Sequence, residues 1–311
     1  MSLPRVTVVG AGQVGATAAL LVALKSTADV VLVDVAEGIA QGKALDMMHA
    51  RSIEHFASSV TGTNEYGPTA GSDVVVITAG LPRKPGMTRE DLLAANGAIV
   101  RSVIAEVRAT SPGAVVLCVT NPLDVMTHLA WRASGFPSGR VLGMGGVLDS
   151  ARFAYFIAQA TGAPVSEVDA MVIGAHGDTM VPLPRFSRVG GVPLPEVLPA
   201  DEVAEVVRRT VFGGAEVVSL LKTGSAFYAP GASVAAMVAA ILGDTGAVMP
   251  SCVLLDGQYG LSGLHLNVPA VLGRGGVRSV PEWDLDAEEL AALRSSAAGV
   301  AETLAAIDLG V

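Results

Sequence analysis

Short apolar runs alternate with helical patterns along the first 140 residues. The runs at 5–10, 29–34, 73–80 and 113–120 read RVTVVG, DVVLVD, DVVVITAG and GAVVLCVT. Between them, apolar residues recur at helical spacing. Strands that are apolar at successive positions are buried on both faces, and the intervening helices supply the crossovers between parallel strands. The pattern therefore predicts a doubly wound parallel α/β domain, which we place at residues 1–142.

The pattern changes near Arg140. Longer helical patterns cover 201–224 and 286–307, and apolar strands at 169–174, 248–257 and 266–276 follow one another in hairpin-like order. We therefore predict an α+β domain over residues 143–311. No repeat, low-complexity tract or flexible linker separates the two parts, so the cleft between them is the expected site.

Composition narrows the possible functions. The chain is 51% hydrophobic and 16% charged, with a net charge of −9, and its basic residues form no run longer than a pair. This balance suits a compact acidic globule and argues against nucleic-acid binding.

Membrane insertion, secretion and metal binding are not expected either. The longest apolar run, near 233–242, is too short to cross a bilayer, and the N-terminus enters a strand pattern without a signal peptide. Cys118 and Cys252 lie in apolar stretches, which indicates reduced buried thiols rather than a disulfide or metal pair. We therefore expect a cytoplasmic protein with no metal site.

A glycine-rich turn follows the first predicted strand. The sequence GAGQVG has G-x-G-x-x-G spacing and leads directly into a helical run. Such glycines permit a tight turn, close approach of the backbone to a pyrophosphate, and close helix–strand packing. Glycines that only punctuate turns are the alternative. The motif predicts a Rossmann dinucleotide site made by Gly10, Ala11, Gly12, Gln13, Val14 and Gly15.

Asp34 ends the second predicted strand, about twenty residues beyond the glycines. A carboxylate at that place can accept hydrogen bonds from the ribose hydroxyls of NAD, and it repels the additional phosphate of NADP. A helix cap is the alternative role. The next residues offer no arginine to receive that phosphate, so the sequence favours NAD.

Five further polar segments fall at predicted strand or helix ends: TAGLPRKPGMTRED, VTNPLDV, GVLDSARF, GAHGDTM and LLKTGSAFYAP. Together with GAGQVG, and in this order, they resemble the lactate/malate dehydrogenase superfamily over nearly the whole chain, most closely its malate-specific members. The resemblance implies a Rossmann domain followed by an α+β substrate-binding domain, and NAD-dependent interconversion of (S)-malate and oxaloacetate.

The resemblance makes His176 the proton acceptor and Asp149 the carboxylate that orients it. Oxidation of a secondary alcohol requires removal of the hydroxyl proton, and imidazole suits that step because its pKa is near neutrality. We expect the flanking Gly174 and Gly177 to leave space for substrate and nicotinamide. Arg152, three residues after Asp149 on a predicted helix, is expected to clamp the substrate carboxylate. A surface ion pair is the alternative for Asp149 and Arg152.

The segment LPRKPGMTRED has the composition of a loop between a strand and a helix, and it resembles the family's mobile active-site lid. Closure of this lid would bring Arg89 to the reacting carbonyl. Asn121 would bond the substrate oxygen, and the resemblance assigns NAD contacts to Asn96, Val119 and Asn121. A solvated basic loop is the alternative for the lid.

Arg83 distinguishes the substrates. Lactate enzymes of the family usually have glutamine at this position, whereas malate enzymes have arginine, which can pair the second carboxylate of malate or oxaloacetate. Pyruvate would leave the guanidinium desolvated and unpaired, a cost of several kcal/mol, or discrimination of about a thousandfold. The alternatives are a lactate or other 2-hydroxyacid dehydrogenase and, less favoured, a catalytically silent NAD-binding protein.

Ala175 stands where some relatives have glycine, which leaves the assigned chemistry unchanged. The helix predicted at 38–53 has an apolar stripe that in relatives packs against another subunit, although such a stripe could equally face its own core. We expect a homodimer or homotetramer.

Overall fold

The computed structural model describes residues 3–82 and 88–306. Among these residues one mixed sheet runs through the molecule in the order β3-β2-β1-β4-β5-β6-β12-β13-β8-β9, and β14 pairs with β13. Its strands are β1 (Arg5–Val9), β2 (Asp29–Val33), β3 (Val60–Thr63), β4 (Val74–Ile77), β5 (Val115–Cys118), β6 (Val141–Gly143), β8 (Val172–Gly174), β9 (Met180–Pro182), β12 (Val248–Asp256), β13 (Ser262–Gly273) and β14 (Gly276–Ser279). A second small sheet contains β7 (Val168–Asp169), β10 (Arg188–Val189) and β11 (Val192–Pro193).

The first six strands are all parallel and take the order 3-2-1-4-5-6. This is the strand order of the dinucleotide-binding Rossmann fold, and it confirms the predicted fold class. The order reverses between β1 and β4, so a crevice opens beyond the carboxyl ends of these two strands. Two strands, β3 and β6, were missed by the sequence analysis because one is polar and the other has three residues.

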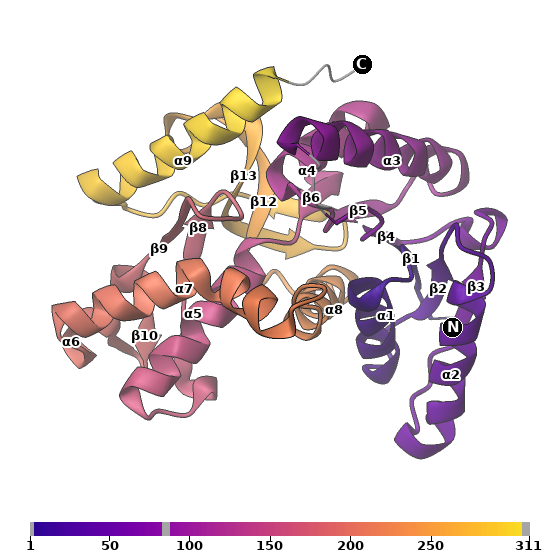
Figure 1. The fold of residues 1–311 in the computed structure, drawn as a ribbon, viewed down its shortest axis with the longest axis horizontal. Coiled ribbons are helices and arrows are strands. Elements are labelled where there is room, and N and C mark those ends of the chain that lie inside the picture. The colour runs from indigo at the N-terminus through magenta and orange to yellow at the C-terminus, as the bar shows by residue number, and fades with distance from the viewer. Residues whose placement is uncertain (1–2, 83–87, 307–311) are drawn as a thin grey trace.

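Strand β4 shows why a parallel strand can be apolar at every position of its sequence. Successive side chains of a strand point to opposite faces. Val74 and Val76 therefore join the core beneath α1 and α8, whereas Val75 and Ile77 join the core beneath α3 and α4. Figure 1 shows these two helix pairs on opposite sides of the sheet. Each full burial of such a side chain contributes about 1.5–3 kcal/mol to folding.

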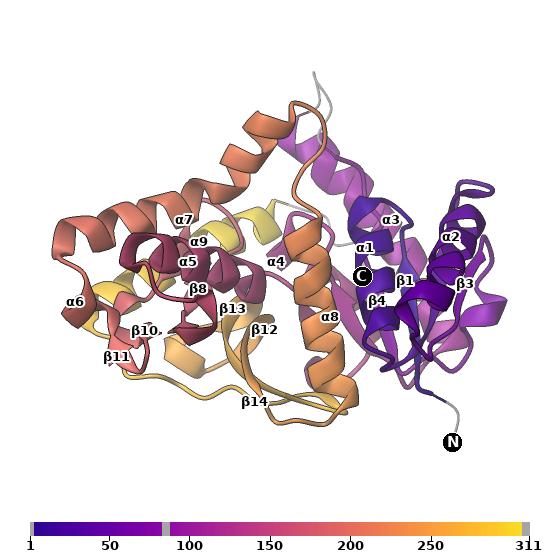
Figure 2. The same ribbon diagram turned by 90° about the horizontal axis from the view of Figure 1, so that it is seen from below.

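The helices are α1 (Gln13–Leu24), α2 (Ile39–Glu54), α3 (Arg89–Thr110), α4 (Leu123–Ser134), α5 (Gly146–Thr161), α6 (Leu194–Val197), α7 (Ala200–Leu221), α8 (Tyr228–Leu242) and α9 (Ala287–Ala305). Helix α8, from the second half of the chain, packs on α1 of the first half, as Figure 2 shows. Gly231 makes the close approach possible, because a Cβ there would lie 2.6 Å from a Thr17 methyl carbon. Within the described residues, no helix combines the length and apolar character that crossing a membrane requires.

The second half extends the same sheet with antiparallel strands. β12 and β13 pair antiparallel along nearly their full length, as the hairpin-like order of the sequence predicted. A separate apolar cluster, centred on Phe153, Phe156 and Ile157 of α5, joins this helix to α6, α7 and the small sheet. Both cysteines are buried with free thiols, as expected.

Two histidines form a buried pair between α4 and β13. The Nδ1 atoms of His128 and His265 lie 3.2 Å apart, and the side chains are 6% and 0% exposed. Burial is the main cause that lowers the pKa of His128 to about 4 and that of His265 to about 3. The charge of Arg132 lowers the pKa of His128 further, and repulsion between the two rings, when both are protonated, lowers that of His265. Both rings are therefore neutral in the folded protein at physiological pH.

This pair predicts acid sensitivity of the fold. Unfolded histidines have the ordinary pKa near 6.5, so from that pH down to about 4 the unfolded chain binds protons that the folded pair does not. Stability should fall across this range. We expect the decline of the melting temperature from pH 6.5 to pH 4, followed by circular dichroism, to be less steep in His265→Leu. His49→Gln, a change of an exposed histidine, should keep the wild-type slope; an unchanged slope in His265→Leu would contradict the assignment.

Candidate active site

The glycine-rich turn joins β1 to α1 with backbone geometry that the side chains of other residues would prevent. Gly10 has φ +102°, and a Cβ there would lie 2.7 Å from the backbone nitrogen of Ala79. A Cβ on Gly15 would collide with the carbonyl oxygen of Gly10. By contrast, nothing lies within 4 Å of a Cβ on Gly12, where the turn faces open space. The N-terminus of α1 and the turn thus present backbone amides to a ligand.

Asp34 follows β2 directly and faces this turn. Its carboxylate accepts hydrogen bonds from the backbone N–H groups of Ala11 at 2.6 Å and Ala36 at 2.9 Å. On the other side of the turn, Lys43 of α2 donates to the carbonyl oxygen of Ala11 at 2.7 Å. The turn is therefore held between an acidic and a basic side chain, which fixes it before any cofactor binds.

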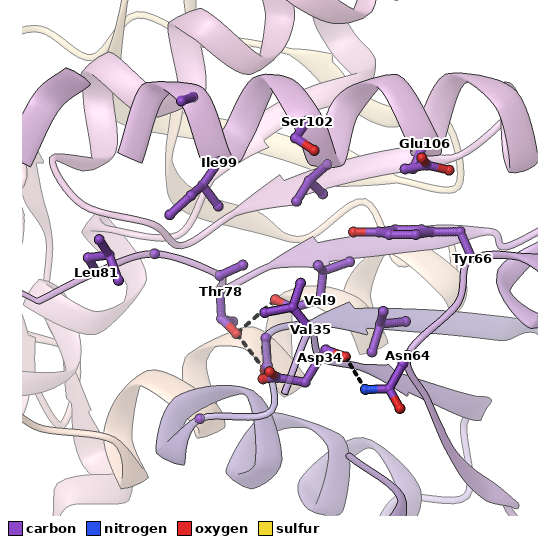
Figure 3. A pocket seen from close by; sticks show the side chains of 17 residues that line it. Val9, Asp34, Val35, Asn64, Tyr66, Thr78, Leu81, Ile99, Ser102 and Glu106 are labelled. Carbon is purple, nitrogen blue, oxygen red and sulfur yellow. Dashed lines mark hydrogen bonds between the residues drawn. The ribbon is translucent and has the colours of Figure 1, made fainter. Parts of the chain in front are cut away.

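A cavity of about 620 Å³ opens beside the turn. Gly10, Gly12 and Asp34 form part of its wall, and α3 covers another part (Figure 3). Volume, glycine turn and acidic residue together fit a dinucleotide such as NAD. NAD, when bound, takes up the hydride that leaves an alcohol carbon.

Of the residues that line this cavity, only Gly10, Gly12 and Asp34 were predicted from the sequence; Tyr66 and Glu106 are among those that were missed. Figure 3 shows the Tyr66 ring along the cavity, with Glu106 on α3 beyond it. Burial, and next the charge of Glu106, raises the pKa of Tyr66 to about 12, so this phenol remains neutral. The flat ring offers an apolar surface for a planar group.

Asn96 holds the far end of the cavity in place. Its side chain is 2% exposed, and its Oδ1 accepts from the backbone N–H of Leu81 at 2.7 Å. Its Nδ2 donates to the carbonyl oxygen of Asn121 at 2.8 Å. These contacts occupy the amide, so any contribution of Asn96 to cofactor binding passes through the backbone that it positions. Val119 is partly buried and Asn121 is exposed, at the end of β5.

The structure brings His176, Asp149 and Arg152 together. His176 follows β8, whereas the other two residues lie in the first two turns of α5. The Nδ1 atom of His176 is 2.7 Å from Oδ2 of Asp149, and Nη1 of Arg152 is 3.1 Å from Oδ1. The Asp149 side chain is only 2% exposed, so this carboxylate is enclosed by its two partners.

This contact fixes the tautomer of the histidine. A carboxylate only accepts hydrogen bonds, so Nδ1 carries the proton and Nε2 keeps its lone pair. Burial is the largest single effect on the pKa of His176 and lowers it, but the charge and hydrogen bond of Asp149 outweigh burial. The net pKa is raised. A ring with this arrangement can take up a proton at Nε2 and later return it.

The two glycines beside His176 have different surroundings. Nothing lies within 4 Å of a Cβ on Gly177, as expected for a residue that leaves space for a ligand. The expectation was wrong for Gly174. With φ +85°, it packs inward, and a Cβ there would lie 3.0 Å from the Ser296 hydroxyl oxygen. Gly174 is needed for close packing on α9 rather than for access.

A second buried carboxylate, Asp124, lies beneath the histidine, and the sequence analysis overlooked it. Asp124 belongs to the first turn of α4, and its Oδ2 accepts from the backbone N–H of His176 at 3.0 Å. Burial raises its pKa to about 6, although the hydrogen bond from His176 acts in the opposite direction. Its position in TNPLDV, three residues after Asn121, was the only signal available in the sequence.

Backbone and side-chain contacts connect the cavity with the histidine. Leu81 lines the cavity, Asn96 bonds both Leu81 and Asn121, and Asn121 lies two residues before the first residue of α4. Asp124 of this helix then bonds the backbone of His176. His176, Asp149 and Arg152 are not part of the lining of the cavity, and these hydrogen bonds are what link the cavity to the His176–Asp149 pair.

The expected lid is only partly described. Arg83 lies outside the described residues, as does the side chain of Arg89. The segment was predicted to be a loop as far as residue 91. This prediction was wrong for its last three residues, which belong to α3. Arg89 begins α3, because Thr88 and Asp91 form a reciprocal capping box at 3.0 Å.

Both halves of the chain match models of one protein family. Residues 4–143 match the family described as lactate/malate dehydrogenase, NAD binding domain, and residues 146–307 match its alpha/beta C-terminal domain. The chain is 50% identical to a malate dehydrogenase of a Roseiflexus species over 98% of each chain.

Solved structures agree with these matches. The crystal structure of malate dehydrogenase from Salinibacter ruber is 50% identical with a TM-score of 0.93, covering 96% of each chain. A Cryptosporidium parvum lactate dehydrogenase, complexed with lactic acid and NAD, is 42% identical with a TM-score of 0.95, covering 99% of each chain.

The open space at Gly12 predicts a specific effect on cofactor binding. Gly12→Ala should fold normally, because φ is −65° and a Cβ meets no neighbour, yet the methyl group fills the space where a pyrophosphate would approach. We expect the Kd for NADH, measured by fluorescence titration, to rise about tenfold or more. The matched control is Gly42→Ala in α2, which also meets no neighbour and should leave the Kd unchanged. Wild-type affinity in Gly12→Ala would show that the cofactor does not pass this turn.

Proposed function

The chain belongs to the lactate/malate dehydrogenase family, and from this premise we propose that it is an NAD-dependent malate dehydrogenase that interconverts (S)-malate and oxaloacetate. The observation that carries the chemistry is the 2.7 Å contact between His176 and Asp149, because it supplies a base with a defined tautomer. Relatives of about 50% identity over nearly the full chain carry the same activity in their names.

His176 acts as the general base in malate oxidation. Its Nε2 takes the hydroxyl proton, and Asp149 stabilises the resulting imidazolium. Oxidation therefore requires the neutral ring and declines as the pH falls below the raised pKa of His176. Oxaloacetate reduction requires the protonated ring and declines as the pH rises above it.

The arginines select and orient the diacid. Arg152 is held by Asp149 and remains 18% exposed, so its guanidinium can still present donors to a substrate carboxylate. Its other face lies along α7, where Gly213 and Gly214 leave room for it. We propose that Arg83 pairs the second carboxylate, that Arg89 polarises the reacting carbonyl, and that Asn121 bonds the substrate oxygen.

Self-association is part of the proposal. Helix α2 has one face on its own core, with Ala40, Ala44 and Met47 buried. Three other apolar residues of this helix are exposed: Ile39 by 46%, Leu45 by 58% and Ile53 by 75%. Figure 2 shows α2 at the edge of the molecule. Exposed apolar surface on a helix at the edge of the molecule supports a homo-oligomer in which α2 contacts a second copy of the chain.

We propose a cytoplasmic location, because the two buried thiols are free and suit a reducing compartment.

The substrate assignment is tested by comparing oxaloacetate and pyruvate as substrates with NADH in steady state. The wild-type protein should favour oxaloacetate in kcat/KM by about a thousandfold. In Arg83→Gln the preference should move toward pyruvate by about a hundredfold or more, because the unpaired guanidinium is removed.

Lys84→Gln serves as the matched control for this test, since it also removes one charge from the same segment. It should retain the preference for oxaloacetate. A higher kcat/KM for pyruvate than for oxaloacetate in the wild-type protein would instead identify a lactate or related 2-hydroxyacid dehydrogenase.

A further inference from the structure

One hydroxyl group from the last helix of the chain bonds both ends of the loop that carries His176. Strands β8 and β9 pair antiparallel, and residues 175–179 form the loop between them. The Ser296 hydroxyl oxygen accepts the backbone N–H of Ala175 at 2.8 Å and donates its own proton to Oγ1 of Thr179 at 3.3 Å. The first and last residues of the loop are therefore joined through a single side chain.

Ser296 is a buried residue of α9, and this helix packs on β8 and β9 (Figure 1). The residue is 1% exposed, so water does not compete for its hydrogen bond with Ala175. A buried N–H group that loses its acceptor is destabilising, because no solvent molecule replaces the lost partner. The contact is therefore a firm one, and it crosses 121 positions of the sequence.

The backbone before the loop is shaped for a close approach of α9. Gly174 has φ +85°, and a Cβ there would lie 3.0 Å from the Ser296 hydroxyl oxygen and 3.3 Å from the carbonyl oxygen of Thr179. A side chain at this position would push the helix away from the loop. Because glycine has none, the hydroxyl reaches the backbone of the next residue.

Helix α9 is itself anchored on both sides of Ser296. Arg185, which follows β9, donates to the two carboxylate oxygens of Glu289 in the first turn of α9, at 3.1 and 2.8 Å. Near the other end of the helix, Leu304 packs against the two large apolar cores. Between them Leu293 is fully buried. A hydroxyl on this helix can therefore set the position of a loop.

The position of this loop matters for the reaction because proton transfer tolerates little displacement. The contact with Asp149 fixes the tautomer and the rotation of the His176 ring. It does not by itself fix how far the loop projects from the sheet. Donor and acceptor must approach to about 2.6–3.2 Å, and a misplacement of about 1 Å can lower a rate about a hundredfold.

We propose that Ser296 is a positioning residue of the reaction: its hydroxyl ties both ends of the His176 loop to α9 and thereby holds the ring where it exchanges a proton with the substrate. Ser296 touches neither substrate nor cofactor in this role. The inference rests on the proposed function for its effect on catalysis, but its effect on the ring can be measured without turnover.

The titration of the His176 ring reports its position. Burial lowers the pKa of His176, the charge and hydrogen bond of Asp149 raise it, and the charges of Asp124 and Arg152 have smaller, opposite effects. The Ser296 hydroxyl has no charge. Its removal can therefore move the titration only by changing how the ring lies relative to these groups.

The central test is Ser296→Ala. Alanine is the most favourable residue in a helix, so the variant should fold. We expect kcat for oxaloacetate reduction to fall about tenfold, while KM and the Kd for NADH stay within about twofold of wild type. The His176 titration, followed by NMR and assigned with His176→Gln, should move to lower pH because the ring lies less firmly against Asp149.

Ser295→Ala is the matched control, since it removes the same group from the neighbouring, exposed position of the same helix. It should retain the wild-type kcat and His176 titration. A residue that only stabilises the fold would behave differently: Ser296→Ala would lower the melting temperature and leave both kcat and the titration unchanged. That result would overturn the proposal.

Thr179→Val gives a second, independent test, which decides the question if Ser296→Ala does not fold. Thr179 is exposed, and valine has the same shape without the oxygen to which Ser296 donates. The bond to Ala175 remains, so kcat should fall only about two- to threefold, and the titration should move in the same direction. Wild-type values of both would refute the role of Ser296. The proposed function fails separately, if the wild-type protein does not reduce oxaloacetate with NADH.

Discussion

The site depends on one buried charge, the carboxylate of Asp149, and on the two groups that compensate for its burial. A carboxylate that is 2% exposed needs partners, and here they are the ring of His176 and the guanidinium of Arg152. The same two contacts define the chemistry. The first fixes which ring nitrogen can take a proton, and the second holds the guanidinium that, in the proposed function, binds the substrate carboxylate. The tautomer of His176 and the position of the Arg152 guanidinium are therefore consequences of one arrangement.

The fold makes this arrangement possible by carrying one sheet through the molecule. β6 of the parallel half pairs with β12 at Cys252 and Gly143, and β13 then pairs with β8 at Asn267 and Gly174. The dinucleotide turn after β1 and the histidine after β8 are thereby set on a common framework. Asn96 and Asp124 supply the side-chain contacts between them. Packing and these hydrogen bonds hold the turn and the histidine in place before a ligand binds, so binding loses little free energy to the ordering of these groups.

Much of this could be predicted from sequence because the signals are local. Continuous apolar strands predicted the parallel sheet, the glycine spacing predicted the dinucleotide turn, and the three-residue interval between Asp149 and Arg152 placed both on one helix face. Two features could not be predicted because they depend on contacts between residues more than a hundred positions apart. Gly174 packs inward against Ser296, and the buried Asp124 carboxylate accepts hydrogen bonds from Cys252 and Asn267. The start of α3 at Arg89 was missed because the prolines and glycine before it suggested a longer loop. The short strands β3 and β6 gave too few residues for a periodic signal.

The most direct test of the central claim is single-turnover reduction of oxaloacetate by the NADH-loaded protein in His176→Asn, followed by NADH absorbance. Asparagine is close in size and polar but cannot exchange a proton near neutral pH. The account predicts that NADH still binds with wild-type affinity, while the rate falls by about 10²- to 10⁴-fold. A rate equal to that of the wild-type protein would show that the proton comes from another group and would contradict the account.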